Sequence, residues 1–390
     1  MKVAKIIEGS PDNKMGLFND AILRTKRLKS KVKSVDCYMV RVRYSFALRI
    51  LKGKIRLPPK ERVSLVDGIW FKNLWVKIGL LDYILVYKLN ARAFLCERSL
   101  RKYDNIFRGF DVITSHGLLA NVLAKIVNEN QGLPYVPTWH GSDINIYPFK
   151  NDRRRIAIKY IMDSAYANVF VSNKLMETSC RISKKSNKEV LYSSINSIFF
   201  RFSEERRNEL RRRYSIQNKK VVGFVGNLID IKNVMVLAPL FRRLQDSLED
   251  VAFFIVGEGN RSFKLQEEMS KLRVNNVTFF GKLDPVKIPE IMNVIDILVL
   301  PSLNEGLPLV TLEALSCGAH VVGSDRGGIP EAIGVDNTFR LDDCFVDNCS
   351  KRILEVFEGR VQPPKISNEF SEVRTCKRER SLLSEAVSKR

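Results

Sequence analysis

The sequence has 390 residues, of which 45% are hydrophobic and 28% charged, as in ordinary globular proteins. A single hydrophobic core seldom supports so long a chain, so two domains of about 150 to 200 residues are expected. No apolar stretch reaches the ~18 residues of a membrane span, and the apolar run at residues 3–7 is too short for a secretory signal. The seven cysteines have no CxxC spacing and fit reduced thiols. A cytoplasmic protein is therefore expected.

The positive charge is concentrated in the first half of the chain. The whole chain has a formal charge of +22; residues 1–200 hold 36 Lys and Arg against 16 Asp and Glu, a net +20, which leaves +2 for residues 201–390. A basic half beside a neutral half indicates one domain that faces an anionic partner. Nucleic acid and an anionic membrane surface are the two candidates.

In chain order, residues 3–7 predict a buried strand, followed by a glycine-containing loop that ends at Gly16 and a Lys- and Arg-rich helix from about Asn19. The same alternation continues with a helix at 118–129 and with strands at 111–114, 135–138 and 167–172. Strands that alternate with helices are typical of a parallel sheet covered by helices. The first half therefore predicts one α/β domain.

A second series of strands follows the charged segment at residues 201–220. Five apolar runs separated by helix-like stretches predict them, at 221–225, 252–256, 277–280, 297–300 and 320–323. The predicted fold is α/β, with two tandem Rossmann-like doubly wound domains. We expect the domains at residues 1–200 and 201–368, with a helical tail at 369–390 that packs back on the first domain.

Residues 301–318, PSLNEGLPLVTLEALSCG, combine a loop with the start of a helix. Glu305 and Gly306 lie in the loop, a helix is expected to begin near Pro308, and Glu313 falls on its early turns. Ligands of open α/β sheets lie beyond the carboxyl ends of strands, where a helix N-terminus offers free backbone N–H groups to a phosphate. Glycine allows close approach to the backbone, and proline at the first helical position costs no hydrogen bond. The segment predicts an anion site between two glutamates.

Glu305 and Glu313, followed by SCGAHVVGSDRGGIPEAI, resemble the Glu-x7-Glu signature and the Gly-Gly-x-Pro-Glu loop of family-4 retaining glycosyltransferases, the "glycosyl transferases group 1" type with the GT-B fold. The resemblance implies two domains that face each other across a cleft. It also implies that Glu313 binds the ribose hydroxyls of a nucleotide and that Glu305 lies against the donor sugar as a catalytic residue. The backbone that would receive the pyrophosphate belongs to Gly306, Leu307, Pro308 and Leu309.

The segment VGFVGNLIDIKN, residues 222–233, resembles the family's loop in which a glycine, an arginine and a lysine face the donor phosphates. Gly226 and Lys232 match this pattern, and the resemblance makes Lys232 a catalytic cation. Asn227 stands where arginine is usual, so one of two positive charges is missing. Gly257 and Gly281 follow strands whose loops hold the base in this family, and the base itself, uridine or guanosine, stays open.

His116 and His140 each follow a predicted strand of the first domain, where catalytic residues of α/β sheets collect. The run from His140 to Asp143 resembles the family's acceptor-side loop, whose histidine touches the donor sugar, so His140 is expected to be catalytic. His116, Asp143 and Gly16 are expected on the acceptor side. A structural role for His116 remains equally open, because a histidine at a strand end often only satisfies buried polar groups.

The resemblance implies transfer of a hexose-type sugar, with retention, from a nucleoside-diphosphate donor to a glycan or polyprenyl-diphosphate-linked acceptor in bacterial surface polysaccharide synthesis. No Asp-x-Asp pair and no metal-ligand spacing occur in the sequence, so neither a metal nor another cofactor is expected. Two other classes stay open. One is a basic nucleic-acid-binding protein, which would leave residues 301–331 unexplained, so no nucleic-acid partner is expected. The other is a phosphorylase or epimerase of the same fold.

Residues 68–89 mix Trp70 and Trp75 with Lys72 and Lys77. Such a segment could lie in the interface of an anionic membrane, which would place the protein peripherally on the inner face of the plasma membrane. The same segment could equally form buried helices of the first domain.

Overall fold

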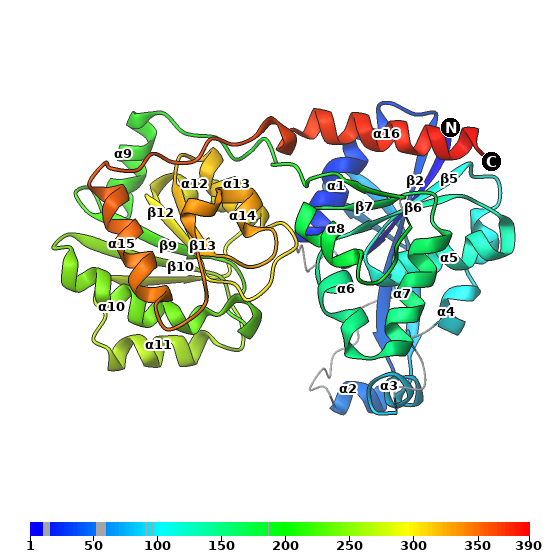
Figure 1. The fold of residues 1–390 in the computed structure, drawn as a ribbon, viewed down its shortest axis with the longest axis horizontal. Coiled ribbons are helices and arrows are strands. Elements are labelled where there is room, and N and C mark those ends of the chain that lie inside the picture. The colour runs from blue at the N-terminus through cyan, green and yellow to red at the C-terminus, as the bar shows by residue number, and fades with distance from the viewer. Residues whose placement is uncertain (11–15, 52–59, 90–92, 95–96, 186) are drawn as a thin grey trace. The chain divides into compact units, whose positions relative to one another are not determined.

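The computed structural model describes residues 1–10, 16–51, 60–89, 93–94, 97–185 and 187–390, and the chain divides into two units. Unit 1 comprises Met1–Ser194 and Ser371–Arg390, and unit 2 comprises Ile195–Phe370 (Figure 1). Unit 2 thus begins at Ile195 rather than at residue 201, and the C-terminal tail belongs to unit 1 from Ser371 onward. Both chain termini lie on unit 1.

Unit 1 is built on a sheet with the strand order β3-β4-β2-β1-β5-β6-β7-β8. Its neighbouring strands pair in parallel, except that β3 pairs antiparallel with β4. The strands are β1 (Lys2–Glu8), β2 (Ser34–Tyr44), β3 (Val63–Val66), β4 (Ile69–Ile78), β5 (Val112–His116), β6 (Tyr135–Trp139), β7 (Asn168–Phe170) and β8 (Lys188–Val190). Because β1 lies in the middle of the sheet, its apolar run is buried on both faces.

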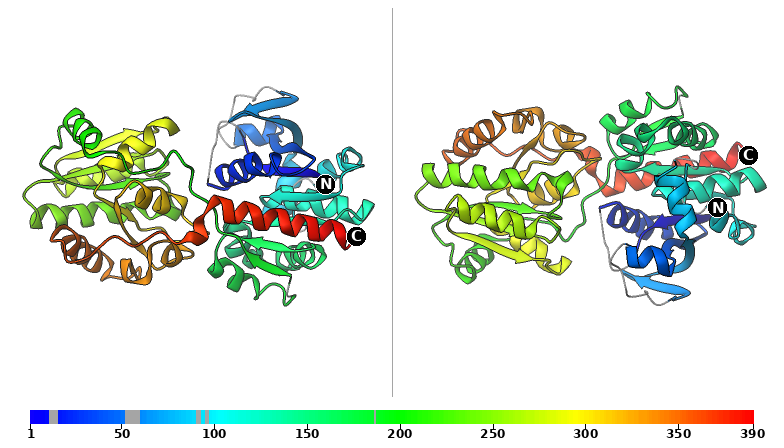
Figure 2. Two further views of the ribbon diagram at one scale, coloured as in Figure 1. Left: turned by 90° about the horizontal axis from the view of Figure 1, so that it is seen from above. Right: turned by 90° about the horizontal axis from the view of Figure 1, so that it is seen from below.

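Helices cover both faces of this sheet. The described ones are α1 (Gly16–Lys29), α2 (Phe46–Leu51), α3 (Leu80–Tyr87), α4 (Glu97–Arg101), α5 (Leu118–Gln131), α6 (Ser142–Asn145), α7 (Asp152–Ser164), α8 (Asn173–Ser179) and α16 (Glu372–Ser388). The C-terminal helix α16 packs against α1 and against β5 and β6, and Figure 2 shows it running beside α1. Leu382 and Leu383 of α16 join a core cluster with Val3 and Val112, so the tail completes the core of unit 1.

Three expectations for the first half were wrong or incomplete. Residues 68–89 are not a pair of buried helices, because 10 of them form strand β4 and α3 follows it. In β4, Phe71 is buried and Trp70 is 61% exposed, and alternate side chains of this kind fit a strand rather than a helix. Strands β2, β3, β4 and β8 were not predicted. The helix α1 begins at Gly16 rather than near Asn19, and residues 11–15 of the loop before it lie outside the described residues.

Unit 2 has a parallel sheet with the order β11-β10-β9-β12-β13-β14. Its strands are β9 (Lys220–Val225), β10 (Val251–Val256), β11 (Val277–Gly281), β12 (Ile297–Leu300), β13 (His320–Ser324) and β14 (Thr338–Phe339). All five predicted strands are present, and the two-residue β14 was not predicted. The apolar runs of β10, β12 and β13 are buried throughout, as expected for strands covered on both faces.

The described α-helices of unit 2 are α9 (Glu204–Arg213), α10 (Leu237–Ser247), α11 (Ser262–Lys271), α12 (Ile288–Val294), α13 (Leu309–Ser316), α14 (Ile329–Ile333) and α15 (Phe345–Phe357). Helix α12 contacts α9 and α13, and α13 contacts α14; on the other face of the sheet, α10 contacts α11 and α15 (Figure 1). Both units are therefore doubly wound sheets of the predicted α/β class.

Candidate active site

Three glycine loops line the carboxyl ends of β9, β10 and β11. The backbone N–H of Gly257 donates to the carbonyl of Gly281 at 2.8 Å, and a Cβ on Gly257 would lie 1.9 Å from the carbonyl oxygen of Gly226. A side chain at Gly257, whose φ is +130°, is thus excluded by both space and conformation. The three predicted donor-binding glycines are neighbours at one edge of the sheet, and each is partly exposed.

The loop after β12 presents an uncapped helix N-terminus at the same edge. Pro308 is the residue before α13 rather than its first helical residue, and no side chain caps the helix. The hydroxyl and the N–H of Thr311 both donate to the Pro308 carbonyl, at 2.7 and 3.1 Å. The N–H groups of Leu309 and Val310, in the first turn, then remain available to an anion, whose charge the helix dipole favours.

The Gly-Gly-x-Pro-Glu loop holds this segment in place. Gly328 N–H donates to the carbonyl of Glu305 at 3.3 Å, and a Cβ on Gly327 would lie 1.9 Å from the same oxygen. The side chain of Ser324 donates to the Ser302 carbonyl at 2.6 Å. The backbone around Glu305 is therefore fixed by contacts that tolerate no side chain at residue 327.

Lys232 and Glu305, both predicted to be catalytic, form an ion pair with 2.5 Å between Nζ and Oε1. Their loops are also joined through the backbone, because Leu303 N–H donates to the Ile231 carbonyl at 2.8 Å. Both side chains are only partly exposed, at 21% and 13%. The Lys232 ammonium is thus held by Glu305, in the loop that leads into α13.

Glu313 lies on α13, and its carboxylate makes no hydrogen bond or ion pair with any described residue. Burial raises the pKa of its carboxyl group from 4.5 to about 7. A carboxylate without a partner in such surroundings is costly, and two neighbouring hydroxyl groups would satisfy it. The position and the missing partner fit the predicted contact with ribose.

The raised pKa of Glu313 predicts a pH-dependent stability. The unfolded chain ionises this group near pH 4.5 and the folded chain near pH 7, so its contribution is fully present below about 4.5 and is lost as pH rises through about 7. Urea unfolding at pH 5 and pH 8 should show this loss in the wild type and a smaller one in Glu313→Gln. The exposed Glu267→Gln variant is the control. An equal pH difference in Glu313→Gln and the wild type would contradict the assignment.

In unit 1, His116 and His140 meet at the carboxyl ends of β5 and β6. His116 Nδ1 and His140 Nε2 are 3.0 Å apart, so the two rings share a hydrogen bond. Burial is the main cause that lowers the pKa of both imidazoles well below 6.5, and the nearby cations Lys5 and Arg24 lower it further. Both rings are therefore neutral near pH 7.

The other two residues predicted on the acceptor side, Asp143 and Gly16, differ in their contacts. Asp143 accepts hydrogen bonds from the backbone N–H groups of His140, at 3.2 Å, and Gly141, at 2.8 Å, so its carboxylate holds the loop after β6. Burial nevertheless raises its pKa. Gly16 begins α1, is exposed and has open space where a side chain would lie. Asp143 thus supports His140 from its own loop, and nothing in the described structure requires glycine at position 16.

Unit 2 is similar to a known protein family. Residues 206–372 match the family described as Glycosyl transferases group 1. This match covers most of unit 2 and less than half of the chain.

Curated relatives of the chain carry glycosyltransferase and synthase names. The chain is 28% identical over 264 residues to the Bacillus subtilis (strain 168) protein named as teichuronic acid biosynthesis glycosyltransferase TuaC, and 25% identical over 223 residues to N-acetyl-alpha-D-glucosaminyl L-malate synthase of Bacillus anthracis. These matches cover 67% and 56% of this chain and 65% and 56% of the relatives. The chain thus spans less than two thirds of the length of these relatives.

Solved structures match the whole fold. HepE of Anabaena, in complex with UDP, has a TM-score of 0.75 at 16% identity and covers 99% of this chain and 100% of its own. Sucrose-phosphate synthase from Thermosynechococcus elongatus has a TM-score of 0.70 at 16% identity and covers 100% of this chain and 96% of its own. Two parallel-sheet units of this kind make the GT-B fold.

Unit 2 departs at Asn227 from the pattern of the family that it resembles. This side chain is exposed and carries no charge, so Lys232 has no second cation beside it at position 227. Arg261 lies in the neighbouring loop after β10, where its N–H donates to the Leu228 carbonyl at 2.9 Å, but its guanidinium is paired with Asp230 at 2.5 Å. Both Lys232 and Arg261 are thus held by carboxylates, and Lys232 is the one at a position that matches the family pattern.

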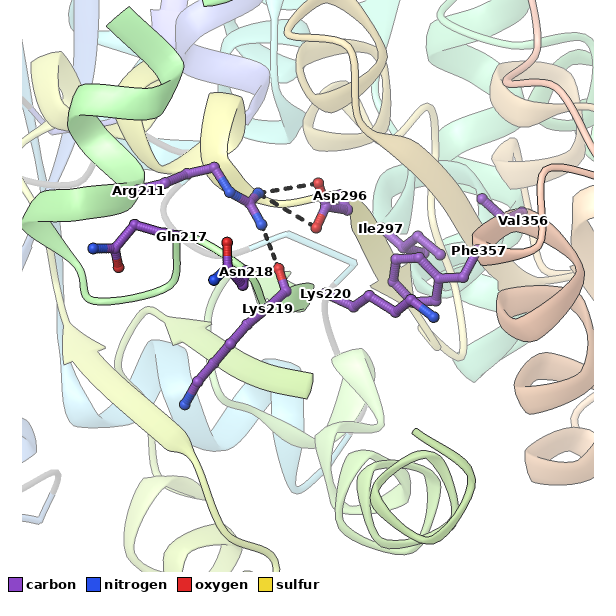
Figure 3. Close-up of a pocket in the computed structure, with 9 residues that line it drawn as sticks. All are labelled: Arg211, Gln217, Asn218, Lys219, Lys220, Asp296, Ile297, Val356 and Phe357. Carbon is purple, nitrogen blue, oxygen red and sulfur yellow. Dashed lines mark hydrogen bonds and ion pairs between the residues drawn. The ribbon is translucent and has the colours of Figure 1, made fainter. Parts of the chain in front are cut away.

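A shallow cavity of about 430 Å³ lies at the opposite, amino-terminal ends of β9 and β12 (Figure 3). Its most prominent cation, Arg211, donates to the Asp296 carboxylate at 3.2 Å and to the carbonyls of Val294 and Lys219. The guanidinium thus holds parts of unit 2 together. This cavity is not part of the donor site.

Two residues near the histidines were missed in the sequence. Glu8 ends β1, and its carboxylate accepts a hydrogen bond from Leu119 N–H at 2.8 Å. It thereby caps α5, because Gly117 at the N-cap position has no side chain that could do so. Asp20 lies on α1 with a carboxylate oxygen within 4.8 Å of ring nitrogens of His116 and His140, a spacing that a metal ion could also use. The histidines were singled out because functional polar residues of α/β sheets gather at the carboxyl ends of strands, and the same criterion would have identified Glu8. No local sequence pattern identifies Asp20.

The described part of the chain contains no helix that is long and apolar enough to cross a bilayer.

Proposed function

We propose that this protein transfers a hexose-type sugar from a nucleoside-diphosphate donor to a hydroxyl group of a glycan or lipid-linked acceptor, with retention at the anomeric carbon. The observation that carries the proposal is the Lys232–Glu305 pair beside the uncapped N-terminus of α13, with the unpartnered Glu313 on the same helix. These groups supply a cation, free N–H groups and a carboxylate, which match a diphosphate and a ribose. The HepE structures, which hold UDP and UDP-glucose, favour a UDP donor.

The chemistry needs charge stabilisation more than a side-chain base. The acceptor hydroxyl attacks the anomeric carbon on the face from which the diphosphate leaves; the glycosidic C–O bond forms, the C–O bond to the diphosphate breaks, and a diphosphate oxygen takes the hydroxyl proton. Lys232 and the N–H groups of α13 neutralise the charge that develops on the leaving group. Glu305 releases Lys232 when the phosphate arrives and then lies against the sugar.

Release of the nucleoside diphosphate from a labelled donor, followed with and without EDTA, tests this mechanism. Turnover should persist in EDTA and should fall strongly in Glu305→Ala, with the exposed Glu267→Ala variant as control. Complete dependence on a divalent ion, or unchanged turnover in Glu305→Ala, would refute it. Product analysis separates transfer from the reactions of a phosphorylase or an epimerase, because only transfer places the label on an acceptor hydroxyl.

The setting we propose is bacterial surface polysaccharide synthesis at the cytoplasmic face of an anionic membrane. TuaC, whose name places it in teichuronic acid biosynthesis, supports this setting.

In unit 1, exposed apolar side chains lie on two neighbouring short helices, with Phe46 at 70% and Ile50 at 58% on α2 and Leu81 at 67% on α3. Ser45, just before α2, donates its N–H to the Ile78 carbonyl just before α3, so the two helices start together.

Apolar side chains on a strongly basic half can enter the interface of an anionic bilayer. The protein should float with anionic vesicles at low salt, and Leu81→Glu should reduce the bound fraction several-fold because it removes apolar contact and adds a like charge. Val335→Glu, at a position of similar exposure in unit 2, is the control. Failure of the wild type to bind anionic vesicles at low salt would exclude the membrane setting.

A further inference from the structure

Three side chains from three elements of unit 1 converge in a largely buried cluster that includes His140. Asp20 comes from α1, His116 from the end of β5 and His140 from the loop after β6, and one ligand atom of each lies within 4.8 Å of the others. Asp20 and His116 are completely buried, and His140 is partly exposed. The cluster therefore leads from the interior of unit 1 to its surface.

Two polar atoms of this cluster lack a partner among the described residues. They are Oδ1 of Asp20 and Nε2 of His116, whereas Oδ2 of Asp20 pairs with Arg24 Nε at 2.9 Å. Leaving such atoms unsatisfied is costly, and a carboxylate accepts the hydrogen bond that a ring N–H donates. The simplest solution is that Asp20 and His116 satisfy each other, directly or through one buried water.

The direction of the hydrogen bond between the two rings then follows. If the unpartnered Nε2 of His116 carries the proton for this carboxylate, His116 Nδ1 is left as an acceptor. His140 must then donate its Nε2–H across the 3.0 Å contact, which leaves its Nδ1 with a lone pair. This nitrogen makes no hydrogen bond with a described residue and is not among the buried unsatisfied atoms, so it is reachable from outside.

We propose that Asp20, His116 and His140 form a hydrogen-bonded relay that fixes His140 as the Nε2–H tautomer and presents its Nδ1 as the acceptor for a hydroxyl group of the substrate. The role of substrate hydroxyl rests on the proposed function; the tautomer does not. Asp20 and His116 are positioning residues, since they act through His140. The relay sets the direction of hydrogen bonds and moves no proton.

The titratable groups around this cluster come from three elements, and of these only the two cations lower the pKa of the rings. Lys5 comes from β1, Arg24 from α1, and Glu379 and Cys376 from α16. Burial and the two cations lower the pKa of both histidines, so the tautomer should persist from pH 6 to pH 8.

The same charges argue against a metal ion at this cluster. The Asp20 carboxylate already pairs with Arg24 Nε at 2.9 Å, and Lys5 pairs with Glu379 at 3.0 Å. Two buried cations and two buried anions thus balance, and a divalent cation would add uncompensated positive charge to a buried region. A relay of hydrogen bonds needs no such charge.

Nitrogen-15 NMR of histidine-labelled protein tests the tautomers without any substrate. The chain has only three histidines, so the spectrum is simple, and His320 in unit 2 serves as an internal reference. Both His116 and His140 should appear as neutral Nε2–H tautomers from pH 6 to pH 8. Asp20→Asn, which keeps the shape of the side chain, should disturb the His116 signal and leave His320 unchanged. A His140 proton on Nδ1, a cationic ring at pH 7 or stoichiometric copurifying metal would overturn the proposal.

Kinetics supply the second readout. His116→Asn places an amide oxygen near the position of Nδ1 and should keep most of the donor turnover, whereas His116→Leu removes the acceptor and should lower kcat by about tenfold with a smaller change in KM. Equal losses in the two variants would indicate a merely structural role and overturn the relay. If no transfer is detected at all, the proposed function fails, and the NMR result still decides the tautomer.

Discussion

Lys232→Met is expected to lower donor turnover by about 10²- to 10³-fold, because it removes the cation that neutralises the leaving diphosphate. The side chain is held within 2.5 Å of Glu305 and is only 21% exposed, so the lost charge has no free replacement in its own loop. Asn227, where the family has arginine, cannot compensate. Steady-state release of nucleoside diphosphate from a labelled donor measures the effect.

The control for this experiment is Lys271→Met. Lys271 lies on α11 of the same unit, is 61% exposed and pairs with Glu267, so its loss should leave turnover nearly unchanged. A loss below tenfold in Lys232→Met would show that the diphosphate is neutralised elsewhere. Asn227→Arg supplies the converse test, because a second cation should tighten nucleoside-diphosphate binding about three- to tenfold and should partly rescue Lys232→Met.

Glu379→Leu is expected to destabilise unit 1 by about 3 to 5 kcal/mol, because it leaves buried cations without their partner. Glu379 accepts a hydrogen bond from Lys5 Nζ at 3.0 Å, and its second oxygen lies 3.9 Å from Arg24. Lys5 is completely buried in the middle strand of the sheet, so water cannot replace the carboxylate. Thermal or urea unfolding of the full chain measures the loss as an earlier transition of unit 1.

Two further variants separate this charge effect from damage to α16. Glu385→Leu changes an exposed glutamate of the same helix, paired with Arg378, and should unfold nearly as the wild type does. Lys5→Met combined with Glu379→Leu should recover much of the stability, because an apolar pair can replace a buried ion pair. A double variant as unstable as Glu379→Leu would mean that the helix, and not the ion pair, was disturbed.

The sequence predicts unit 2 better than unit 1 for a physical reason. Strands β10, β12 and β13 are covered on both faces, so they are short unbroken apolar runs that stand out from the helices around them. Strands β2 and β4 contain Arg41, Arg43, Lys72 and Lys77, and their charges hide a run of this kind. In β4, the alternation of buried Phe71 with exposed Trp70 and Lys72 was present in the sequence and was misread.

Some residues of the candidate sites could likewise be predicted from the sequence, and others could not. Glu305, Glu313 and the glycines lie in short motifs whose spacing carries their geometry, and the structure brings them to one edge of the sheet together with Lys232. The pairing of Lys5 with Glu379 joins residues 374 positions apart, and that of Asp20 with the histidines depends on how α1 packs. No local pattern encodes such contacts, because they arise only when the helices dock on the sheet.

Thermal unfolding with a panel of nucleoside diphosphates tests the central claim most directly. A ligand of the folded state at 100 times its Kd adds about 2.7 kcal/mol to the free energy of unfolding. We expect UDP or GDP to raise the transition temperature of unit 2 in the wild type and in Lys271→Met, and to raise it much less in Lys232→Met and Glu313→Ala. If neither nucleotide stabilises the wild type, or if all four proteins are stabilised equally, the donor site is not where Lys232, Glu305 and Glu313 meet.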